Sequence, residues 1–452
     1  MTEKESTINK FFWSDFSKIY KKPSLIDNHL IKNSDRIEAT IINNFTELDL
    51  SQNYSIYANG GFGRKEMFPS SDIDISIIEN KNSTKDKENL EIFITKLWDL
   101  GFQVGHSVRS IKDIKKISKN DLKEFTSYLT RRALISTPEI DIKVSKTLDG
   151  IWSKKNFFNA KFLEQDERYS SYHSTAFNLE PDLKESPGCM RDFQTSLWIL
   201  QQCFNLNNYT QIKKSKEFSL EVESAINSYN FIKAMRFASN ILSANNRLSF
   251  ESQLEISKSA KLNKNSGKES VEKMMKDFYG HASNLSNFNN LVFETFKEKN
   301  SFAIKKRFGD FYLKANKIGI RNSDISENKH LIFGIFIAIG SNKKVNAIDT
   351  STMALLKKNI HVIDSNFKKD GFYASQFLEI LRSKYNLSSI LKSMKSLGII
   401  QAYIKEFDEV VGQMQFDLFH VYTVDEHTFK VVRNMRQMQI EFHEDFKLEY
   451  EL

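Results

Sequence analysis

A glycine-rich turn between two predicted strands constrains the fold of this chain more than any other sequence feature. The hydrophobic stretch at residues 54–58 predicts the first strand, and Gly60, Gly61 and Gly63 follow it directly. Glycine has no Cβ, so the backbone N–H groups of such a turn can approach an anion closely. A short helical turn after the glycines would add the positive end of its dipole. The stretch therefore predicts a phosphate-binding turn.

Two aspartates follow on the second predicted strand, at residues 72–78. Asp72 and Asp74 are two residues apart, and because side chains alternate along a strand, both carboxylates lie on one face. Adjacent carboxylates repel each other unless a cation lies between them. Oxygen ligands suit Mg²⁺, which proteins usually bind through one or two carboxylates together with substrate phosphates. A glycine turn or an Asp-x-Asp pair alone is usually structural, but the combination predicts metal-assisted nucleotidyl transfer.

The sequence at residues 60–74, GGFGRKEMFPSSDID, resembles the polymerase-β-like nucleotidyltransferase superfamily. More narrowly, it is similar to the bifunctional uridylyltransferase/uridylyl-removing enzymes that modify the nitrogen-signalling protein PII. This resemblance implies an enzyme that moves UMP from UTP to a tyrosine of PII and releases pyrophosphate. It implies catalytic Asp72 and Asp74 that bind Mg²⁺, with Mn²⁺ as the alternative. The implied nucleotide-binding residues are Gly60, Gly61, Gly63, Arg64, Ser70 and Ser71.

A third strand is predicted at residues 102–108, after a helix around residues 90–98. The family carries the segment VGHSVR in this place, so the resemblance implies that His106 and Arg109 lie near the site as phosphate contacts. A lone histidine after a strand is more often structural. Many members of the superfamily use a third carboxylate on a later strand, but no residue from 101 to 111 is acidic. The third metal ligand stays unassigned, with the candidates Asp99, Asp113, Asp121 and Asp141.

The composition is that of a globular protein. Its 452 residues are enough for two or three domains, and 40% of them are hydrophobic. The excess of 65 Lys and Arg over 57 Asp and Glu gives a net charge of +8, which either favours polyanions or reflects a Lys- and Asn-rich composition. Cys189 and Cys203 lack the spacing of a zinc site or a disulfide framework, so we expect a cytoplasmic protein. The longest apolar run, at 331–339, is too short to cross a bilayer, and no signal peptide or membrane anchor is expected.

Beyond about residue 121 the hydrophobic pattern is helical. Apolar residues recur at helical spacing at 122–133, 231–242 and 271–282, and such stripes are more often core than ligand sites. Helices and irregular joins are expected again from residue 301 onward. We predict the α+β class, with a small polymerase-β-like nucleotidyltransferase α/β domain followed by a mostly helical remainder. The predicted divisions are an N-terminal extension at 1–36, the nucleotidyltransferase domain at 37–140, a helical bundle at 141–310, a helical connecting region at 311–410 and the start of a further domain at 411–452.

A second motif, NLEPDLKESPGCMRD at residues 178–192, carries two of the five prolines of the chain. Its Pro-Gly loop ahead of an apolar run predicts a rigid turn that begins a helix. The segment closely resembles a signature of the same family, from which it departs at Ser186 and Cys189, where glycine is usual. Lys184 and Arg191 are predicted phosphate contacts because both carry positive charge beside this loop. The alternative is that they pair with their acidic neighbours and hold the bundle on the catalytic domain.

A third motif, at residues 411–428, looks like the entry to the HD-type phosphohydrolase domain of the family. His427 matches the first metal-binding histidine of that domain. Such a site also needs a following His-Asp pair and a distant aspartate, and His443 has the wrong spacing to provide the pair. On the interpretation that this domain is truncated, we expect uridylyl-removing activity to be lost.

Two other functions share this site chemistry. An RNA-directed nucleotidyltransferase would use the same glycines and aspartates, but it should carry an RNA-binding module, and the sequence shows none. A regulatory PII-binding protein without turnover would share the family sequence, yet the intact Gly60–Gly61 pair and the two aspartates argue against it. We therefore expect UTP and PII as partners and no nucleic acid.

Overall fold

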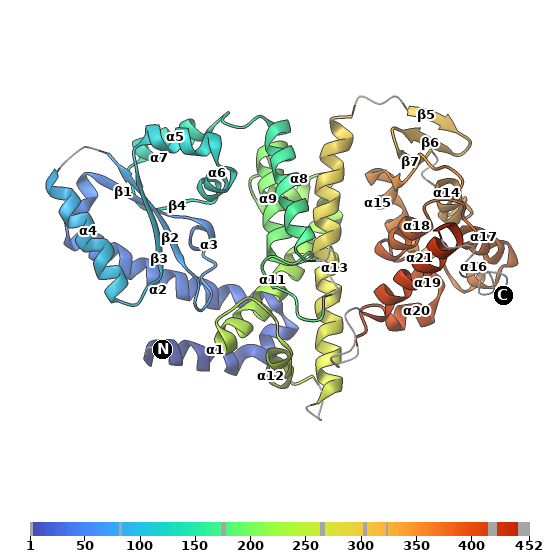
Figure 1. Ribbon diagram of the computed structural model, residues 1–452, viewed down its shortest axis with the longest axis horizontal. Coiled ribbons are helices and arrows are strands. Elements are labelled where there is room, and N and C mark those ends of the chain that lie inside the picture. Colours follow the sequence, from blue (N-terminus) through green and yellow to red (C-terminus); the bar gives the residue numbers. More distant parts are fainter. Residues whose placement is uncertain are drawn as a thin grey trace.

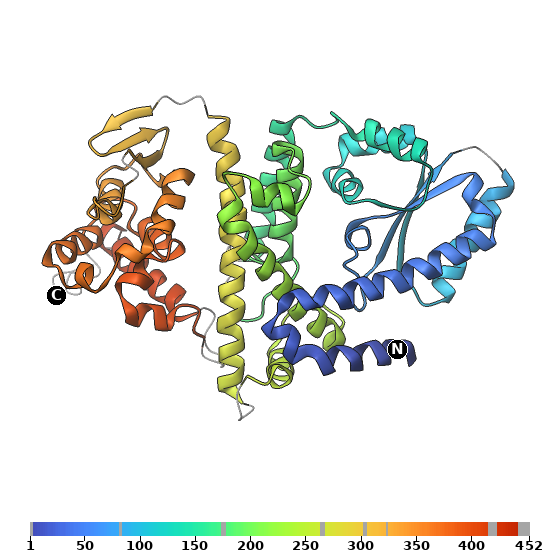
Figure 2. The same ribbon diagram turned by 180° about the vertical axis from the view of Figure 1, so that it is seen from behind.

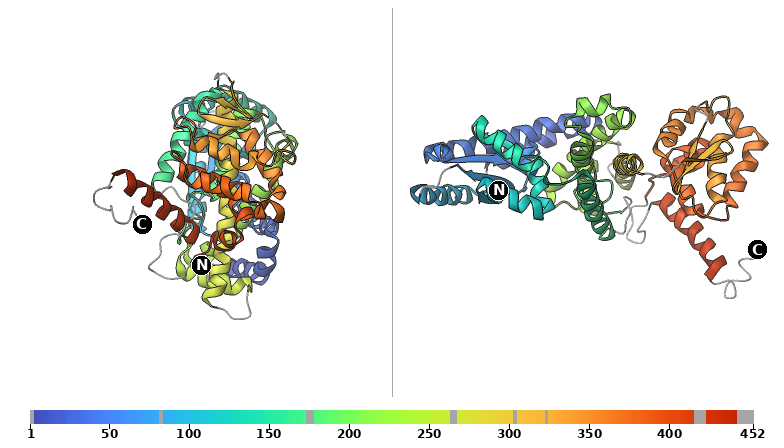
Figure 3. Two further views of the ribbon diagram at one scale, coloured as in Figure 1. Left: turned by 90° about the vertical axis from the view of Figure 1, so that its right-hand side faces the viewer. Right: turned by 90° about the horizontal axis from the view of Figure 1, so that it is seen from above.

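The computed structural model describes residues 3–80, 84–172, 178–262, 267–301, 305–321, 324–414 and 423–441. Three parts follow one another in space: an N-terminal part with a sheet, a central helical bundle and a C-terminal module with a second sheet (Figures 1 and 3). The long helix α13 (Lys268–Lys299) stands between the bundle and the C-terminal module (Figure 1). This arrangement confirms the predicted α+β class.

The first sheet has four strands in the order β3-β2-β1-β4. β1 runs antiparallel to β2 and β4, whereas β2 and β3 are parallel. The strands are β1 (Tyr54–Ala58), β2 (Ile73–Glu79), β3 (Val104–Arg109) and β4 (Arg132–Ile135). The first three confirm the predicted strands. The helical stripe predicted through residue 133 is wrong at its end, because α6 (Leu122–Leu129) stops and Ala133 lies in β4.

One face of this sheet is covered by α2 (Ile26–Glu47) and α4 (Thr84–Asp99), which share a core with the strands. The isoleucines of β2 at 73, 75 and 77 are buried in that core, so strand alternation directs Asp74 to the opposite face. There the apolar residues of the sheet pack with three helices. These are α5 (Ile111–Asn120), α6 and α7 (Pro138–Leu148), while α3 (Gly60–Gly63) follows the end of β1.

The predicted N-terminal extension is not a separate unit. α2 begins at Ile26 and runs through the predicted boundary after residue 36, and Figure 2 shows it extending from the sheet to the bundle. α1 (Glu3–Lys21) belongs to the bundle core, since the ring of Phe12 stacks on that of Phe237, with their centroids 4.5 Å apart. η1 (Pro23–Leu25) and η2 (Leu50–Gln52) are short 3-10 turns at the two ends of α2.

The central bundle surrounds the largest apolar core of the described chain. The stripes predicted at 231–242 and 271–282 lie in α11 and α13, and most of their apolar residues are buried in that core. The turn predicted at 178–192 does begin a helix, α9. Besides α13, the helices of the bundle are α8 (Lys154–Ser170), α9 (Met190–Phe204), α10 (Tyr209–Lys214), α11 (Ser219–Ser243) and α12 (Phe250–Ala260).

The C-terminal module contains a second sheet in the order β5-β6-β7-β8. The prediction of helices and irregular joins after residue 301 is wrong here, because two tight turns, with positive φ at Gly309 and Ala315, link three short antiparallel strands. The predicted boundary after residue 310 falls inside the first hairpin. The strands are β5 (Lys305–Phe308), β6 (Phe311–Lys314), β7 (Lys317–Ile320) and β8 (Ala347–Ile348).

Helices complete this module around a core of their own. They are α14 (Leu331–Gly340), α15 (Thr350–Lys358), the 3-10 turn η3 (Ile360–Val362), α16 (Ser365–Lys369), α17 (Gly371–Leu381), α18 (Leu387–Ser396), α19 (Ile399–Tyr403), α20 (Lys405–Val410) and α21 (Val424–Glu441). Much of the domain start predicted at 411–452 lies outside the described residues. Among the helices that the structure describes, none combines the length and the apolar character needed to cross a bilayer.

Candidate active site

The two aspartates face a cavity of about 750 Å³ between the first sheet and the bundle. The N-terminal part contributes the glycine turn and the carboxylates, and the bundle contributes charged side chains of α8, α11 and the loop before α9. The structure thus brings together two motifs that are more than a hundred residues apart. The predicted site residues that line the cavity are Gly60, Gly61, Arg64, Ser70, Ser71, Asp72, Asp74, Lys184 and Arg191.

Gly63 has a packing role and does not line the cavity. A Cβ on Gly63 would lie 2.2 Å from the carbonyl oxygen of Thr130 and 2.8 Å from that of Ala58. Its N–H donates to the carbonyl oxygen of Asn59 (2.8 Å), and its own carbonyl accepts from Arg132 Nε (3.3 Å). The predicted nucleotide contact of Gly63 is therefore corrected: this glycine holds the turn against the start of β4.

Asp74 lies between two glycines. A Cβ on Gly60 would be 3.0 Å from Asp74 Oδ2, and a Cβ on Gly105 would be 2.9 Å from Oδ1. Burial raises the pKa of Asp74 and the charge of Asp72 raises it further, whereas Lys184 and Arg64 lower it. Two carboxylates with open space beside one of them form a donor set that fits Mg²⁺ or Mn²⁺, and a cation there would relieve their repulsion.

The loop of the second motif is folded around Asp182. Its Oδ1 accepts the backbone N–H groups of Lys184 (2.8 Å) and Glu185 (2.7 Å). The N–H of Asp182 in turn donates to Ser186 Oγ (2.9 Å). The Ser186 hydroxyl thus supplies a hydrogen bond that a glycine at this position could not make.

The base of the same loop is held by Asp192, which is fully buried. Its carboxylate accepts from Arg168 (2.6 Å), from the hydroxyl of Tyr169 (2.6 Å) and from the N–H of Gly188 (2.7 Å). The first two residues belong to α8. Asp192 is therefore satisfied by α8 and by the loop itself, and not by Lys184 or Arg191 as the alternative prediction had it.

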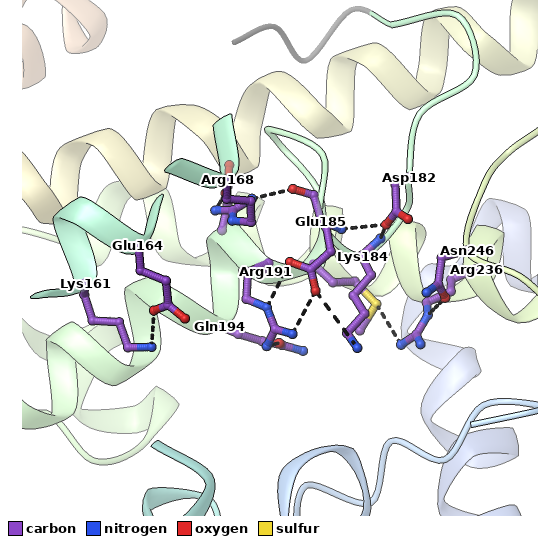
Figure 4. A network of polar contacts seen from close by, with 12 residues as sticks. Lys161, Glu164, Arg168, Asp182, Lys184, Glu185, Arg191, Gln194, Arg236 and Asn246 are labelled. Atoms are coloured by element: carbon purple, nitrogen blue, oxygen red, sulfur yellow. Dashed lines mark hydrogen bonds and ion pairs between the residues drawn. The ribbon is translucent and has the colours of Figure 1, made fainter. Parts of the chain in front are cut away.

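Lys184, Arg191 and Arg236 form a cationic cluster at the cavity (Figure 4). Arg191 forms an ion pair with the carboxylate of Glu185 (2.9 Å), and the Lys184 ammonium lies 4.0 Å from the same carboxylate. The alternative that both cations pair with acidic neighbours is therefore met for Glu185 and not for Asp192. Burial lowers the pKa of Lys184, and the charges of Arg191 and Arg236 lower it further. Burial likewise lowers the pKa of Arg236 to about 10. All three side chains are half-buried. Because like charges repel at short range, an anion bound among them would be stabilised.

A chain of hydrogen bonds joins the glycine turn to α9 across the domain junction. Arg64 Nε donates to Glu66 (2.8 Å), which accepts from the hydroxyl of Tyr229 (2.8 Å). That hydroxyl accepts from Gln194 (3.1 Å), whose Oε1 accepts from Arg191 (2.9 Å). Glu66 lies inside the segment that resembles the superfamily, but Gln194 lies two residues beyond the second motif and Tyr229 lies in α11, which carries no motif. Sequence reasoning missed them for that reason.

His106 and Arg109 do not reach the cavity, which corrects their prediction as phosphate contacts. His106 is in register with Ile75, so its side chain lies on the face opposite Asp74, where its ring is 5.9 Å from that of Trp98. Arg109 lies on the same face as Asp74 but pairs with Glu124 of α6 (2.6 Å). Both residues therefore have structural contacts.

None of the four candidates for a third carboxylate lines the cavity. Asp113 and Asp121 cap α5 and α6 through backbone N–H groups, and Asp141 accepts from the hydroxyl of Tyr57 (2.5 Å). Asp99 is exposed at the end of α4. Within the described ranges, no group of three or more His, Cys, Asp or Glu side chains could hold a metal ion. The third ligand stays unassigned.

His427 lies on α21 in the C-terminal module, where its side chain is exposed. The two residues before it, Asp425 and Glu426, are buried and pair with Lys395. His443 lies outside the described residues. The structure therefore gives His427 no role in the cavity between the sheet and the bundle.

Three family models match successive parts of this chain. A nucleotidyltransferase domain matches residues 39–130, the GlnD PII-uridylyltransferase model matches 156–293, and the third domain of uridylyltransferase GlnD matches 311–403. These ranges correspond to the first sheet with its helices, to the bundle and to the C-terminal module. The bundle and the C-terminal module are thus covered by GlnD models, and most of the first sheet is covered by a general nucleotidyltransferase model.

Curated relatives agree with the models. Bifunctional uridylyltransferase/uridylyl-removing enzymes from Nitrosococcus oceani, Hydrogenovibrio crunogenus and Haemophilus influenzae are 31%, 32% and 33% identical to this chain. The alignments cover 85%, 90% and 94% of this chain but 45%, 48% and 50% of the relatives, so the chain spans about half of their length. The chain belongs to the GlnD uridylyltransferase family and carries a nucleotidyltransferase domain.

Proposed function

We propose that this chain transfers UMP from UTP to a tyrosine of PII and releases pyrophosphate. The observation that carries the proposal is the placement of Asp72 and Asp74 in one cavity with the cationic cluster of Lys184, Arg191 and Arg236. Nucleotidyl transfer needs carboxylates that hold a divalent cation and cations that hold phosphates. PII as acceptor follows the description of the family model that matches the bundle.

Asp72 and Asp74 are the residues that would hold the cation. Mg²⁺, or Mn²⁺, bound there supplies positive charge to the triphosphate and lowers the pKa of the attacking hydroxyl. The glycines on both sides of Asp74 keep its oxygens accessible. Burial and the charge of Asp72 raise the pKa of Asp74, and Lys184 and Arg64 oppose that rise. A cation bound between the carboxylates would favour their charged forms.

The remaining residues bind and orient the nucleotide. Gly60 and Gly61 line the cavity with backbone, and Ser70 and Ser71 offer hydroxyls beside the aspartates. The cationic cluster lies on the bundle side and neutralises the departing pyrophosphate. In the reaction the tyrosine oxygen bonds to the α-phosphorus, the bond from this phosphorus to the bridging oxygen breaks, and the hydroxyl proton passes to solvent. The cytoplasm, where UTP is supplied, is the compartment that we propose.

The test is transfer of label from α-labelled UTP, with PII, transfer RNA or no acceptor in parallel reactions. We expect label on PII only, dependent on a divalent cation and absent when the acceptor tyrosine of PII is replaced by phenylalanine. Label on transfer RNA would favour the RNA-directed alternative. Binding of PII without any transfer would favour a regulatory protein without turnover.

A further inference from the structure

We propose that the free edge of β3 binds the tyrosine-bearing segment of the acceptor protein as an added strand. In this arrangement the tyrosine side chain crosses Gly105 and brings its hydroxyl to Asp74. This inference rests on the proposed function and extends it. It names the surface that binds the acceptor protein, and it explains why the modified side chain is a tyrosine.

β3 is an outer strand of the first sheet, with its unpaired edge on the side away from β2. The N–H of Ile73 donates to the carbonyl of Gln103 (2.8 Å). Because the backbone groups of successive residues in a strand point to opposite sides, those of Val104, His106 and Val108 point outward. No hydrogen bond from the described part of the chain reaches these outward groups.

This edge lacks the features that usually protect one. Natural sheets cover their edges, or place proline, lysine or a bulge on them, whereas residues 104–108 read VGHSV and pair with β2 without interruption. Gly105 and His106 are exposed. Val108, Trp98 and Leu100 beside the edge are 44%, 51% and 50% exposed. An open strand edge with exposed apolar side chains next to it is suited to an extended polypeptide.

Gly105 leaves an open path from this edge to Asp74. The two residues are in register, and a Cβ on Gly105 would lie 2.9 Å from Asp74 Oδ1. The residue opposite Gly105 on an added strand therefore projects its side chain over Gly105, on the face of Asp74. Neighbouring strands are about 4.8 Å apart, so an added strand would lie about 9.6 Å from β2, with β3 between them. A tyrosine side chain is long enough to extend across Gly105 toward Asp74, whereas a serine side chain is too short. The geometry thus selects a tyrosine hydroxyl.

The acceptor and the nucleotide would then approach from different sides. The cavity with Lys184 and Arg191 lies between the sheet and the bundle, whereas β3 is the strand of the sheet that lies away from β4. In-line displacement needs the attacking oxygen and the leaving pyrophosphate on opposite sides of the phosphorus. An acceptor strand on β3 would approach Asp74 across Gly105, which does not line the cavity that holds Lys184 and Arg191.

The first experiment removes the outward N–H donors. Proline is tolerated on an edge strand where its missing N–H faces solvent, so we compare His106→Pro and Val108→Pro with His106→Ala and Val108→Ala. We expect the proline variants to lower kcat/KM for PII at least tenfold relative to the alanine controls. The KM for UTP and the slow hydrolysis of UTP without acceptor should stay within twofold, which shows that the fold and the nucleotide site are intact.

The second experiment does not depend on proline. Val108→Cys should form a disulfide with a cysteine placed three residues from the acceptor tyrosine of PII, the position that faces Val108 when the tyrosine faces Gly105. Ile142→Cys, at another exposed position on α7, should not. Cys189 and Cys203 are buried and do not compete. Equal cross-linking at both positions would overturn the inference, as would proline variants that match their alanine controls.

Two further outcomes are informative. If the proline variants change only self-association of the chain and not PII kinetics, the edge pairs with a second copy and the inference is wrong. If the unchanged chain transfers no UMP to PII, the proposed function fails and this inference fails with it. Transfer to PII with unaffected proline variants would overturn the inference alone.

Discussion

Asp74 shows which parts of a site can be predicted at the scale of single residues. Its pairing with Asp72 and its proximity to Gly60 follow from local spacing, and the structure places all three at the cavity. Gly105 is equally close to its carboxylate, but that contact depends on the register of β2 and β3. Register between strands that are some thirty residues apart has no local signature, so the role of Gly105 could not be predicted.

Replacement of either aspartate tests the site directly. We expect Asp72→Asn and Asp74→Asn to reduce transfer of UMP by about a thousandfold or more, because loss of a carboxylate removes several kcal/mol of charge stabilisation from the transition state. Circular dichroism and the unfolding midpoint should stay close to those of the unchanged chain. Asp99→Asn, at an exposed position on α4, is the control. Normal transfer by either variant would contradict the assignment.

Tyr229 connects two parts of the molecule through a single hydroxyl. Tyr229→Phe removes its hydrogen bonds to Glu66 and Gln194, and Glu66 is only 9% exposed. A buried carboxylate that loses a donor costs about 1–3 kcal/mol, so we expect a lower free energy of unfolding and slower transfer. The control is Tyr373→Phe, which also removes a tyrosine hydroxyl but keeps the ring stacked on Phe367 in the C-terminal module. Urea unfolding measures the free energy of unfolding of both variants. Equal stability would show that the hydroxyl does not link the parts.

At the scale of elements, length and periodicity separate what could be predicted from what could not. The strands β1 to β3 have five to seven residues, α11 and α13 carry long apolar stripes, and the prediction of each element is confirmed. β4 and the strands β5 to β8 have two to four residues, too few for alternation to be distinguished from a helical pattern. These short strands form because they pair with neighbouring strands. The pairing depends on contacts between distant parts of the chain, which a local sequence pattern does not contain.

The loop before α9 depends on one glycine. Gly188 has a φ of +76°, and a Cβ there would lie 2.5 Å from the carbonyl oxygen of Ala282 in α13. We expect Gly188→Ala to displace the loop, to weaken UTP binding and to reduce transfer at least tenfold, since Lys184 and Arg191 move with it. Gly280→Ala on α13 is the matched control, because a Cβ there meets nothing within 4 Å. It should be neutral or stabilise by about 0.5–1 kcal/mol.

His281 on α13 makes the bundle sensitive to acid. Its ring stacks on Phe231 of α11, with centroids 4.1 Å apart, and burial lowers its pKa to about 4. In the unfolded chain the histidine binds a proton near pH 6.5, whereas in the folded chain it does so only near pH 4. As the pH falls from 6.5 to 4, the unfolded state therefore binds more protons than the folded state, and the free energy of unfolding decreases. We expect a loss on the order of 2 kcal/mol over this range.

Urea unfolding at several pH values measures this effect. His281→Asn should flatten the dependence between pH 6.5 and 4, because the titrating ring is gone. His361→Asn, which replaces an exposed histidine at η3, should leave the dependence as it is. A His281→Asn variant with the full acid dependence would assign the effect to other groups.

At the scale of the whole molecule, the candidate site belongs to two parts and is complete in neither. The carboxylates lie on the first sheet and the cationic cluster lies on the bundle. Sequence patterns predicted Lys184 and Arg191 beside a loop but gave no distance to Asp74. Arg236 escaped prediction because it lies in the middle of α11 without a motif. Only the packing of the bundle on the sheet brings these residues into one cavity.

The reverse reaction, hydrolytic removal of UMP from PII, would need a second metal site in the C-terminal part of the molecule. We predict that the described residues do not form a site that hydrolyses uridylylated PII. His427 is exposed on α21, and no group of three or more His, Cys, Asp or Glu side chains among the described residues could hold a metal ion. A single imidazole binds a divalent ion weakly and cannot orient a water molecule. Incubation of uridylylated PII with the chain and Mn²⁺ measures the release of UMP. Release that disappears in His427→Ala would contradict the prediction.

The length of α13 has a mechanical consequence. Its 32 residues form a helix about 48 Å long that contacts the C-terminal module on one side and the loop before α9 on the other. Lys276 donates to the carbonyl of Glu409 in the C-terminal module (2.8 Å), and less than two turns further along Ala282 abuts Gly188 without free space. Because a Cβ on Gly188 would already meet the Ala282 backbone at 2.5 Å, a displacement of α13 toward the loop would move Gly188 as well. The position of α13 therefore sets the position of the loop that carries Lys184 and Arg191.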